Sequence, residues 1–139
     1  MGKIVCGYDG SNCSRAALVE AASQAKACGD ELIVVFGYVV SRLGGEVADY
    51  AAALKEHARA VEKRAVDQAG AEGLEVEVRL VETEPVDALI NIASEVGARA
   101  IVVGAHSESS LKGAIVGAVP QKLLQVSSIP VIAVPESGS

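Results

Sequence analysis

The chain has 139 residues; half are hydrophobic, only 3% are aromatic, and the formal net charge is −6. This length allows one domain with its own core, so we expect a single domain over residues 1–139. The acidic balance argues against a nucleic-acid partner, because phosphate backbones bind basic surfaces, but a few backbone amides can still hold a small nucleotide.

The first third of the chain predicts two strands separated by a helix. Residues 3–8 form a short apolar run, and Asp9, Gly10 and Ser11 follow as a polar turn. The Ala-rich residues 12–28 predict a helix that ends at Gly29. Residues 32–40 show no polar alternation, which is typical of a central strand covered on both faces.

The middle of the chain predicts a loop at residues 41–46, a long helix and a strand. Apolar residues recur in the helix at steps of three and four, and Gly70 and Gly73 are expected to end it. That stripe consists of Val47, Ala51, Leu54, Ala58, Val61, Ala65 and Ala69. Residues 74–81 alternate between apolar and charged, which indicates a strand near a sheet edge.

The last third predicts a helix, a strand, a short helix and a final strand. Pro85 suits a first helical turn, and Leu89 and Ala93 mark that helix's inner face. Residues 100–103 form a fully apolar strand, a short helix spans roughly residues 115–126, and residues 131–134 form the last strand.

This alternation predicts an α/β fold with an open, mainly parallel five-stranded sheet and helices on both faces, similar to a Rossmann fold. If the first three strands proceed outward in one direction, the fourth starts on the other side of the first. The strand order is then 3-2-1-4-5, and ligands bind where the order reverses. Asp9 and Gly104 lie at that point.

The segment from Ile101 to Pro135 is the most informative part of the sequence. An apolar strand runs into Gly104, a loop of small polar residues follows, and Gly117 precedes a helix. Glycines let a backbone approach phosphate oxygens closely, and a helix N-terminus offers unpaired N–H groups. This pattern favours a nucleotide-binding site.

The same segment resembles the universal stress protein family. The chain reads Gly104-Ala105-His106-Ser107, then nine residues, then Gly117-Ala118, where nucleotide-binding members carry Gly-x-x-Gly, nine residues, then Gly-Ser or Gly-Thr. The resemblance extends over nearly the whole chain, from the Tyr8-Asp9-Gly10-Ser11 turn to the Pro130-Val131 entry into the last strand. The chain is therefore identified as a universal stress protein-like domain.

The resemblance implies that the protein binds ATP or AMP, with Mg²⁺ only as a companion of ATP. It places the first-strand Asp at the ribose or adenine end, the end of the second strand at the adenine, and the glycine-rich loop at the phosphates. The matching positions are Gly7, Tyr8, Asp9, Gly37, Gly104, His106, Ser107, Gly117, Ala118 and Val119. Asp9 has a second interpretation, as a cap for the helix that follows.

Two positions depart from the family's pattern. Ser107 replaces the second glycine, and Ala118 replaces the Ser or Thr. Loss of one hydroxyl hydrogen bond costs about 0.5–1.5 kcal/mol, or roughly three- to tenfold in affinity. Two functions stay open: a stress-response regulator that binds an adenine nucleotide, and a dimeric interaction module of the same fold that binds none. A weaker third is a flavoprotein-like or adenylate-transfer domain.

Under either of the first two functions the resemblance implies a homodimer through residues 131–134 and an unknown protein partner. No catalytic residues and no metal site are assigned, since the GxxxxGK[ST] phosphate loop is missing, and slow ATP hydrolysis is the most that the resemblance allows. Cys6, Cys13 and Cys28 have no metal-type spacing and are expected to have no redox role. Without a signal peptide or an apolar run of about 20 residues, the expected location is cytoplasmic, away from membranes.

Overall fold

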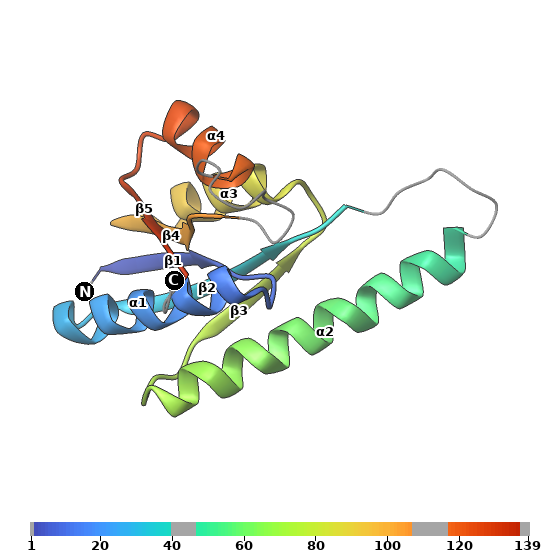
Figure 1. The fold of residues 1–139 in the computed structure, drawn as a ribbon, viewed down its shortest axis with the longest axis horizontal. Helices are drawn as coiled ribbons and strands as arrows, with labels where there is room; N and C mark the ends of the chain where they lie inside the picture. The colour runs from blue at the N-terminus through green and yellow to red at the C-terminus, as the bar shows by residue number, and fades with distance from the viewer. Residues whose placement is uncertain (1, 40–46, 107–116, 137–139) are drawn as a thin grey trace.

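The computed structural model describes residues 2–39, 47–106 and 117–136. Strands and helices alternate along this part of the chain (Figure 1). The elements are β1 (Lys3–Gly7), α1 (Asn12–Cys28), β2 (Glu31–Gly37), α2 (Val47–Ala71), β3 (Glu77–Val81), α3 (Pro85–Val96), β4 (Ala100–Gly104), α4 (Ala118–Val126) and β5 (Val131–Val134).

The five strands form one parallel sheet in the order β3-β2-β1-β4-β5, which confirms the predicted topology. β1 lies at the centre, where Val5 pairs in register with Ile33 of β2 and with Ile101 of β4. β2 and β3 are added on one side of β1, and β4 and β5 on the other, so the strand order reverses between β1 and β4. The carboxyl ends of these two strands therefore diverge into different helices and leave space between them.

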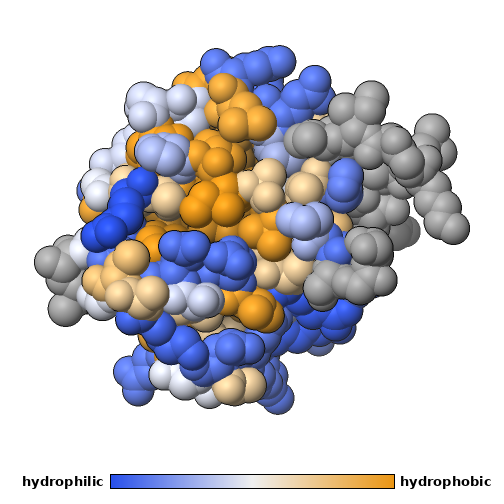
Figure 2. Space-filling model, turned by 60° about the vertical axis from the view of Figure 1, so that its left-hand side comes forward, coloured by the Kyte–Doolittle hydropathy of each residue, from blue (hydrophilic) through white to orange (hydrophobic). Residues whose placement is uncertain are grey.

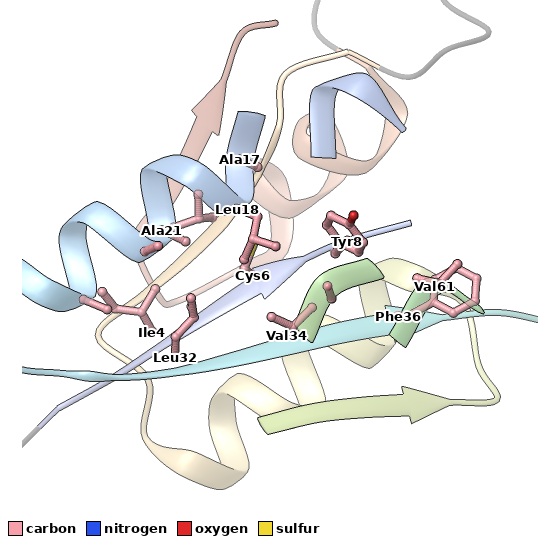
Figure 3. Close-up of a cluster of buried hydrophobic side chains, with 14 of the residues drawn as sticks. Ile4, Cys6, Tyr8, Ala17, Leu18, Ala21, Leu32, Val34, Phe36 and Val61 are labelled. Atoms are coloured by element: carbon pink, nitrogen blue, oxygen red, sulfur yellow. The ribbon is translucent and has the colours of Figure 1, made fainter. Parts of the chain in front are cut away.

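Helices cover both faces of the sheet and make two hydrophobic clusters. Ile4 and Cys6 of β1 point to the face covered by α1 and α2 and share one buried cluster with Leu18 of α1 and Val61 of α2 (Figure 3). Val5 belongs to the opposite cluster, which α3 and α4 cover. Because both faces of β1 are buried, its residues read as an unbroken apolar run in the sequence.

The ends of α1 agree with its sequence signals. Ser11 is the N-cap, and its hydroxyl accepts a hydrogen bond from the N–H of Ser14 at 3.3 Å. Gly29 adopts the left-handed conformation (φ +68°) and donates to the carbonyl of Ala25, which is a conformation that glycine enters at little cost.

Three predicted boundaries were wrong by about three residues. β2 ends at Gly37 rather than residue 40, because its neighbour β3 ends at Val81, the residue paired with Gly37. β3 begins at Glu77, since the N–H of Leu74 bonds to Ala69 in the turn that ends α2. α2 ends at Ala71, between Gly70 and Gly73, as the sequence predicts. α4 begins at Ala118 rather than near residue 115, because Gly117 is still extended.

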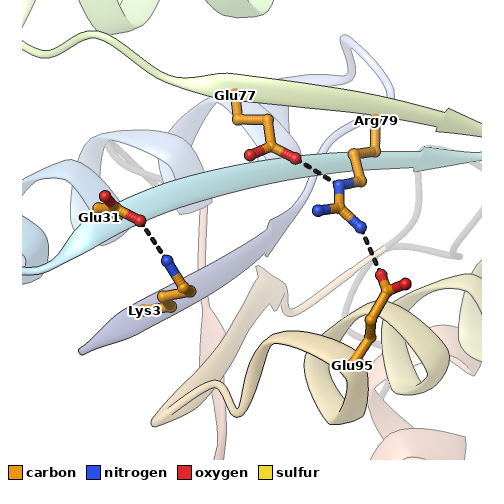
Figure 4. A network of polar contacts seen from close by, with 5 residues as sticks. All are labelled: Lys3, Glu31, Glu77, Arg79 and Glu95. Carbon is orange, nitrogen blue, oxygen red and sulfur yellow. Dashed lines mark hydrogen bonds and ion pairs between the residues drawn. The ribbon is translucent and has the colours of Figure 1, made fainter. Parts of the chain in front are cut away.

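Polar contacts fix the surface of the sheet. The Lys3 ammonium pairs with Glu31 across β1 and β2, and Arg79 of β3 bridges Glu77 and Glu95 (Figure 4). At the opposite end of the sheet from the strand tips, the buried carboxylate of Asp30 accepts the N–H of Gly2 at 3.0 Å. None of the helices described is both long and apolar enough to cross a bilayer.

Candidate functional site

A cleft of about 220 Å³ opens at the carboxyl ends of β1 and β4, where the strand order reverses. Its described lining comes from the end of β1, the first turn of α1, the end of β2, the start of α3, the end of β4 and the start of α4. Nine of the ten residues predicted for a nucleotide site line it: Gly7, Tyr8, Asp9, Gly37, Gly104, His106, Gly117, Ala118 and Val119. The tenth, Ser107, lies outside the described residues.

Gly37 and Gly104 leave no space for a side chain. A Cβ on Gly104 would stand 2.7 Å from the Cβ of Cys13, and a Cβ on Gly37 would stand 2.8 Å from the Cα of Pro85. Both distances are too short for carbon atoms, so glycine at each position allows a helix to start close to a strand end. The sequence interpretation linked these glycines to a ligand; close helix packing gives each a second reason.

The Asp9 carboxylate is exposed at the mouth of the cleft. Its Oδ1 accepts the N–H of Ser11 at 2.9 Å, and its own N–H faces the Ser14 hydroxyl at 3.3 Å. The predicted capping role was wrong, because Ser11 caps α1 while Asp9 closes the turn that precedes the helix. The turn holds the carboxylate at the cleft with one oxygen engaged.

The start of α4 lies in the same cleft. Gly117 is its N-cap and, as a glycine, has no side chain with which to cap the helix. The N–H of Gly117 itself bonds to the carbonyl of Ala105 at 2.7 Å, which anchors the helix to the end of β4. The amides of Ala118 and Val119 follow, and the positive end of the helix dipole lies with them.

Apolar side chains form the walls, and sequence reasoning missed them as site residues. They come from β2, α3, β4 and α4 and comprise Val35, Phe36, Pro85, Leu89, Val103 and Pro120. Their only sequence signal was position, because they lie within two residues of Gly37 or Gly104 or in the first two turns of α3 and α4. Ser11 and Ser14 of α1 were missed as well.

Charge is sparse in the cleft. Among its described lining residues Asp9 is acidic, His106 is half-buried, and none is Lys or Arg. The ring of Tyr8 is buried beneath α2, and this burial raises the pKa of its phenol, partly offset by the charges of Arg15 and Arg64. Within the described ranges, no three His, Cys, Asp or Glu side chains gather as a metal site.

The sequence matches known proteins over almost its whole length. Residues 1–135 match the family model described as the Universal stress protein family. A universal stress protein of Mycobacterium tuberculosis is 31% identical over 143 aligned positions, which cover 94% of each protein.

Solved structures share the fold. A universal stress protein solved in complex with cAMP is 32% identical, with a TM-score of 0.77 and 98% of each chain covered. The universal stress protein from Archaeoglobus fulgidus in complex with dAMP is 26% identical, with a TM-score of 0.69, 96% of this chain and 97% of that chain covered.

Proposed function

The chain belongs to the universal stress protein family, and we propose that it acts as a stress-response regulator that binds an adenine nucleotide, AMP or ATP, in the cleft. One observation carries this proposal: a carboxylate and a helix N-terminus whose N-cap is a glycine line one apolar-walled cleft at the reversal of strand order. Two relatives solved with cAMP and dAMP support the ligand class.

Each part of an adenine nucleotide meets a matching surface. The base fits the apolar walls near Val35 and Leu89, as planar aromatic groups favour dry, apolar pockets. Ribose hydroxyls donate to the Asp9 carboxylate. A phosphate accepts from the amides at the start of α4, where the helix dipole favours negative charge.

The few charges among the described lining residues predict which nucleotides bind most tightly. Without a basic side chain among the described lining residues, a ligand of low charge costs least to desolvate next to Asp9. We therefore expect AMP or a cyclic monophosphate to bind more tightly than free ATP. Mg²⁺ then contributes only by neutralising part of the ATP charge.

The first experiment is gentle purification followed by heat release and chromatography of bound small molecules. Near-stoichiometric AMP or ATP supports the proposal. An empty protein that also fails to bind millimolar AMP, cAMP or ATP with Mg²⁺ in calorimetry would contradict it. The alternative then remains a dimeric interaction module of the same fold.

Three substitutions make the test specific to the cleft. Asp9→Asn keeps the bond to Ser11 but removes the charge, and should weaken AMP binding about tenfold. Asp87→Asn is the matched control, because Asp87 is exposed on α3 and does not line the cleft. Ala118→Ser restores a hydroxyl at an exposed position and should tighten binding three- to tenfold.

Dimerisation through β5 is the second part of the proposal. β5 pairs with β4 along one edge, and no described strand pairs with the other. Figure 2 shows hydrophobic side chains gathered on the side of the molecule where β5 and α4 lie in Figure 1. Leu124 and Val126 of α4 are more than half exposed. An open strand edge beside apolar side chains favours pairing with a second copy, and nucleotide occupancy would then act on that contact or on a partner protein.

A further inference from the structure

A second cavity, which we call the groove, lies between α1 and α2 and is separate from the cleft. It has a volume of about 750 Å³. Its polar lining comes from both helices, from the end of β1 and from the C-terminal segment, and consists of Tyr8, Asn12, Arg15, Arg64, Gln68 and Glu136. Nothing in the proposed nucleotide site uses these polar side chains except Tyr8.

Two arginines make the groove basic in an acidic protein. The chain has a net charge of −6, and two other arginines are paired with acids, Arg79 with Glu77 and Glu95, and Arg99 with Asp30. No ion pair between described residues involves Arg15 or Arg64. Arg15 bonds instead to the neutral amide oxygen of Asn12, a contact that leaves its positive charge uncompensated.

The structure holds both arginines close to the end of β1. Arg64 lies against the turn after Asp9, with its Nη1 3.2 Å from the place of a Cβ on Gly10. Gln68 donates to the main-chain carbonyl of Arg15 at 2.8 Å and accepts the Tyr8 hydroxyl at 3.4 Å. The charges of both arginines lower the pKa of Tyr8 against the larger raising effect of burial, so their field reaches the floor of the groove.

We infer that the groove is a second binding site, which takes a small phosphate-bearing molecule between Arg15 and Arg64. Guanidinium groups present planar pairs of N–H donors that match phosphate oxygens, and two of them from facing helices can hold one phosphate. Gln68 adds a neutral donor, because its amide nitrogen carries a second proton besides the one given to the carbonyl of Arg15. The carboxylate of Glu136 lines the same groove and opposes an anion, so it limits affinity.

The first turn of α1 separates the two cavities. Ser11 and Ser14 line the cleft, whereas Asn12 and Arg15 line the groove. A ligand in the groove therefore contacts the other side of the helical turn that borders the nucleotide cleft. The two sites can be observed independently by amide signals that belong to only one of them.

The test is a titration of the whole, isotope-labelled chain with inorganic pyrophosphate at constant ionic strength, followed by NMR. We expect saturable changes in the chemical shifts of the Gln68 side-chain amide and of the Ala16 amide, while the chemical shift of the Val119 amide does not change.

Variants of the groove test which side chains bind the anion. Arg64→Gln and Arg15→Gln should each weaken binding about tenfold. Lys63→Gln, an exposed neighbour outside the groove, should change the affinity less than twofold. Glu136→Gln should tighten binding.

Three results would overturn the site. One is the absence of saturation up to about 10 mM pyrophosphate, because a dissociation constant above that value is too weak for a specific contact. Another is an equal loss of affinity in Lys63→Gln, which would mean general screening of charge. The last is a shift of Val119 without one of Gln68, which would place the anion in the cleft. A parallel titration with AMP is read at Val119, which lines the cleft alone, and at Gln68, which lines the groove alone, so failure of one site is distinguishable from failure of the other.

Discussion

Gly37 illustrates how a residue can serve packing and a ligand site at once. It lines the cleft, yet a Cβ there would meet the Cα of Pro85 at 2.8 Å and the Cβ of Ala88 at 2.9 Å. One neighbour is backbone and the other is a fully buried alanine, so neither can move without shifting α3. The absence of a side chain therefore sets how closely α3 approaches the end of β2.

We expect Gly37→Ala to lower the free energy of unfolding by about 1–3 kcal/mol, the usual cost of overpacking. Gly70→Ala is the matched control, because no atom lies within 4 Å of a Cβ at that position near the end of α2. There alanine should be neutral or stabilise by up to about 1 kcal/mol. Urea unfolding of both variants measures the difference, and equal stabilities would refute the packing argument.

The buried thiol of Cys6 makes the free energy of unfolding depend on pH above about pH 9. It is fully buried in β1, and this burial raises the pKa of its thiol from the ordinary 9.0 to about 12. Above about pH 9 the unfolded chain loses this proton while the folded chain keeps it. The contribution of the thiol is therefore fully present below pH 9 and is lost as the pH rises towards 12.

Well above pH 9, where the unfolded thiol is mostly ionised, this loss approaches roughly 1 kcal/mol per pH unit. Cys6→Ala should flatten the decline in stability by that slope, although its stability at pH 7 is lower because a buried sulfur is removed. Cys28→Ala should keep the wild-type slope, since Cys28 is exposed. Urea unfolding at several pH values measures the slopes, and parallel curves for Cys6→Ala and wild type would count against the assignment.

At the scale of elements, the sequence predicted the type and order of every strand and helix, since buried strands and amphipathic helices differ in periodicity. Boundaries failed where a neighbour decides them. β2 ends where β3 runs out at Val81, although Tyr38 and Val39 continue its apolar pattern. The residues of a strand therefore do not predict where its partner strand ends.

The candidate site was predictable to a similar extent. The motif and the predicted strand order together placed Asp9, Gly104 and Gly117 in one site, because a parallel topology determines which strand ends lie side by side. The apolar walls were not predictable, since Leu89 reads as an ordinary inner-face residue of α3. The groove was not predictable either, because it depends on tertiary packing. Arg15 and Arg64 lie 49 positions apart on two surface helices, and only the packing of α1 on α2 brings them together.

At the scale of the whole molecule, the two outer strands of the sheet differ in charge, and no further described strand pairs with either. β3 and β5 are the outer strands, and both consist largely of half-buried residues. β3 carries Glu77 and Arg79, and charged side chains on an edge discourage strand pairing. β5 carries Val131, Ile132, Ala133 and Val134, without a charge. The fold thus protects one edge and leaves the other suited to a second copy.

Hydrogen exchange tests this difference within one molecule. In a monomer, the amides on the outer edges of β3 and β5 exchange much faster than those of β1, which is bonded on both sides. If β5 pairs with β5 of a second copy, its amides become protected as the protein concentration rises, while those of β3 do not. Ala133→Lys, at a β5 position that belongs to neither buried cluster, should abolish that protection by placing a charge beside the strand edge. Equal, concentration-independent exchange at both edges, together with a monomeric mass in light scattering, would exclude the β5 dimer and leave any regulatory contact to another surface.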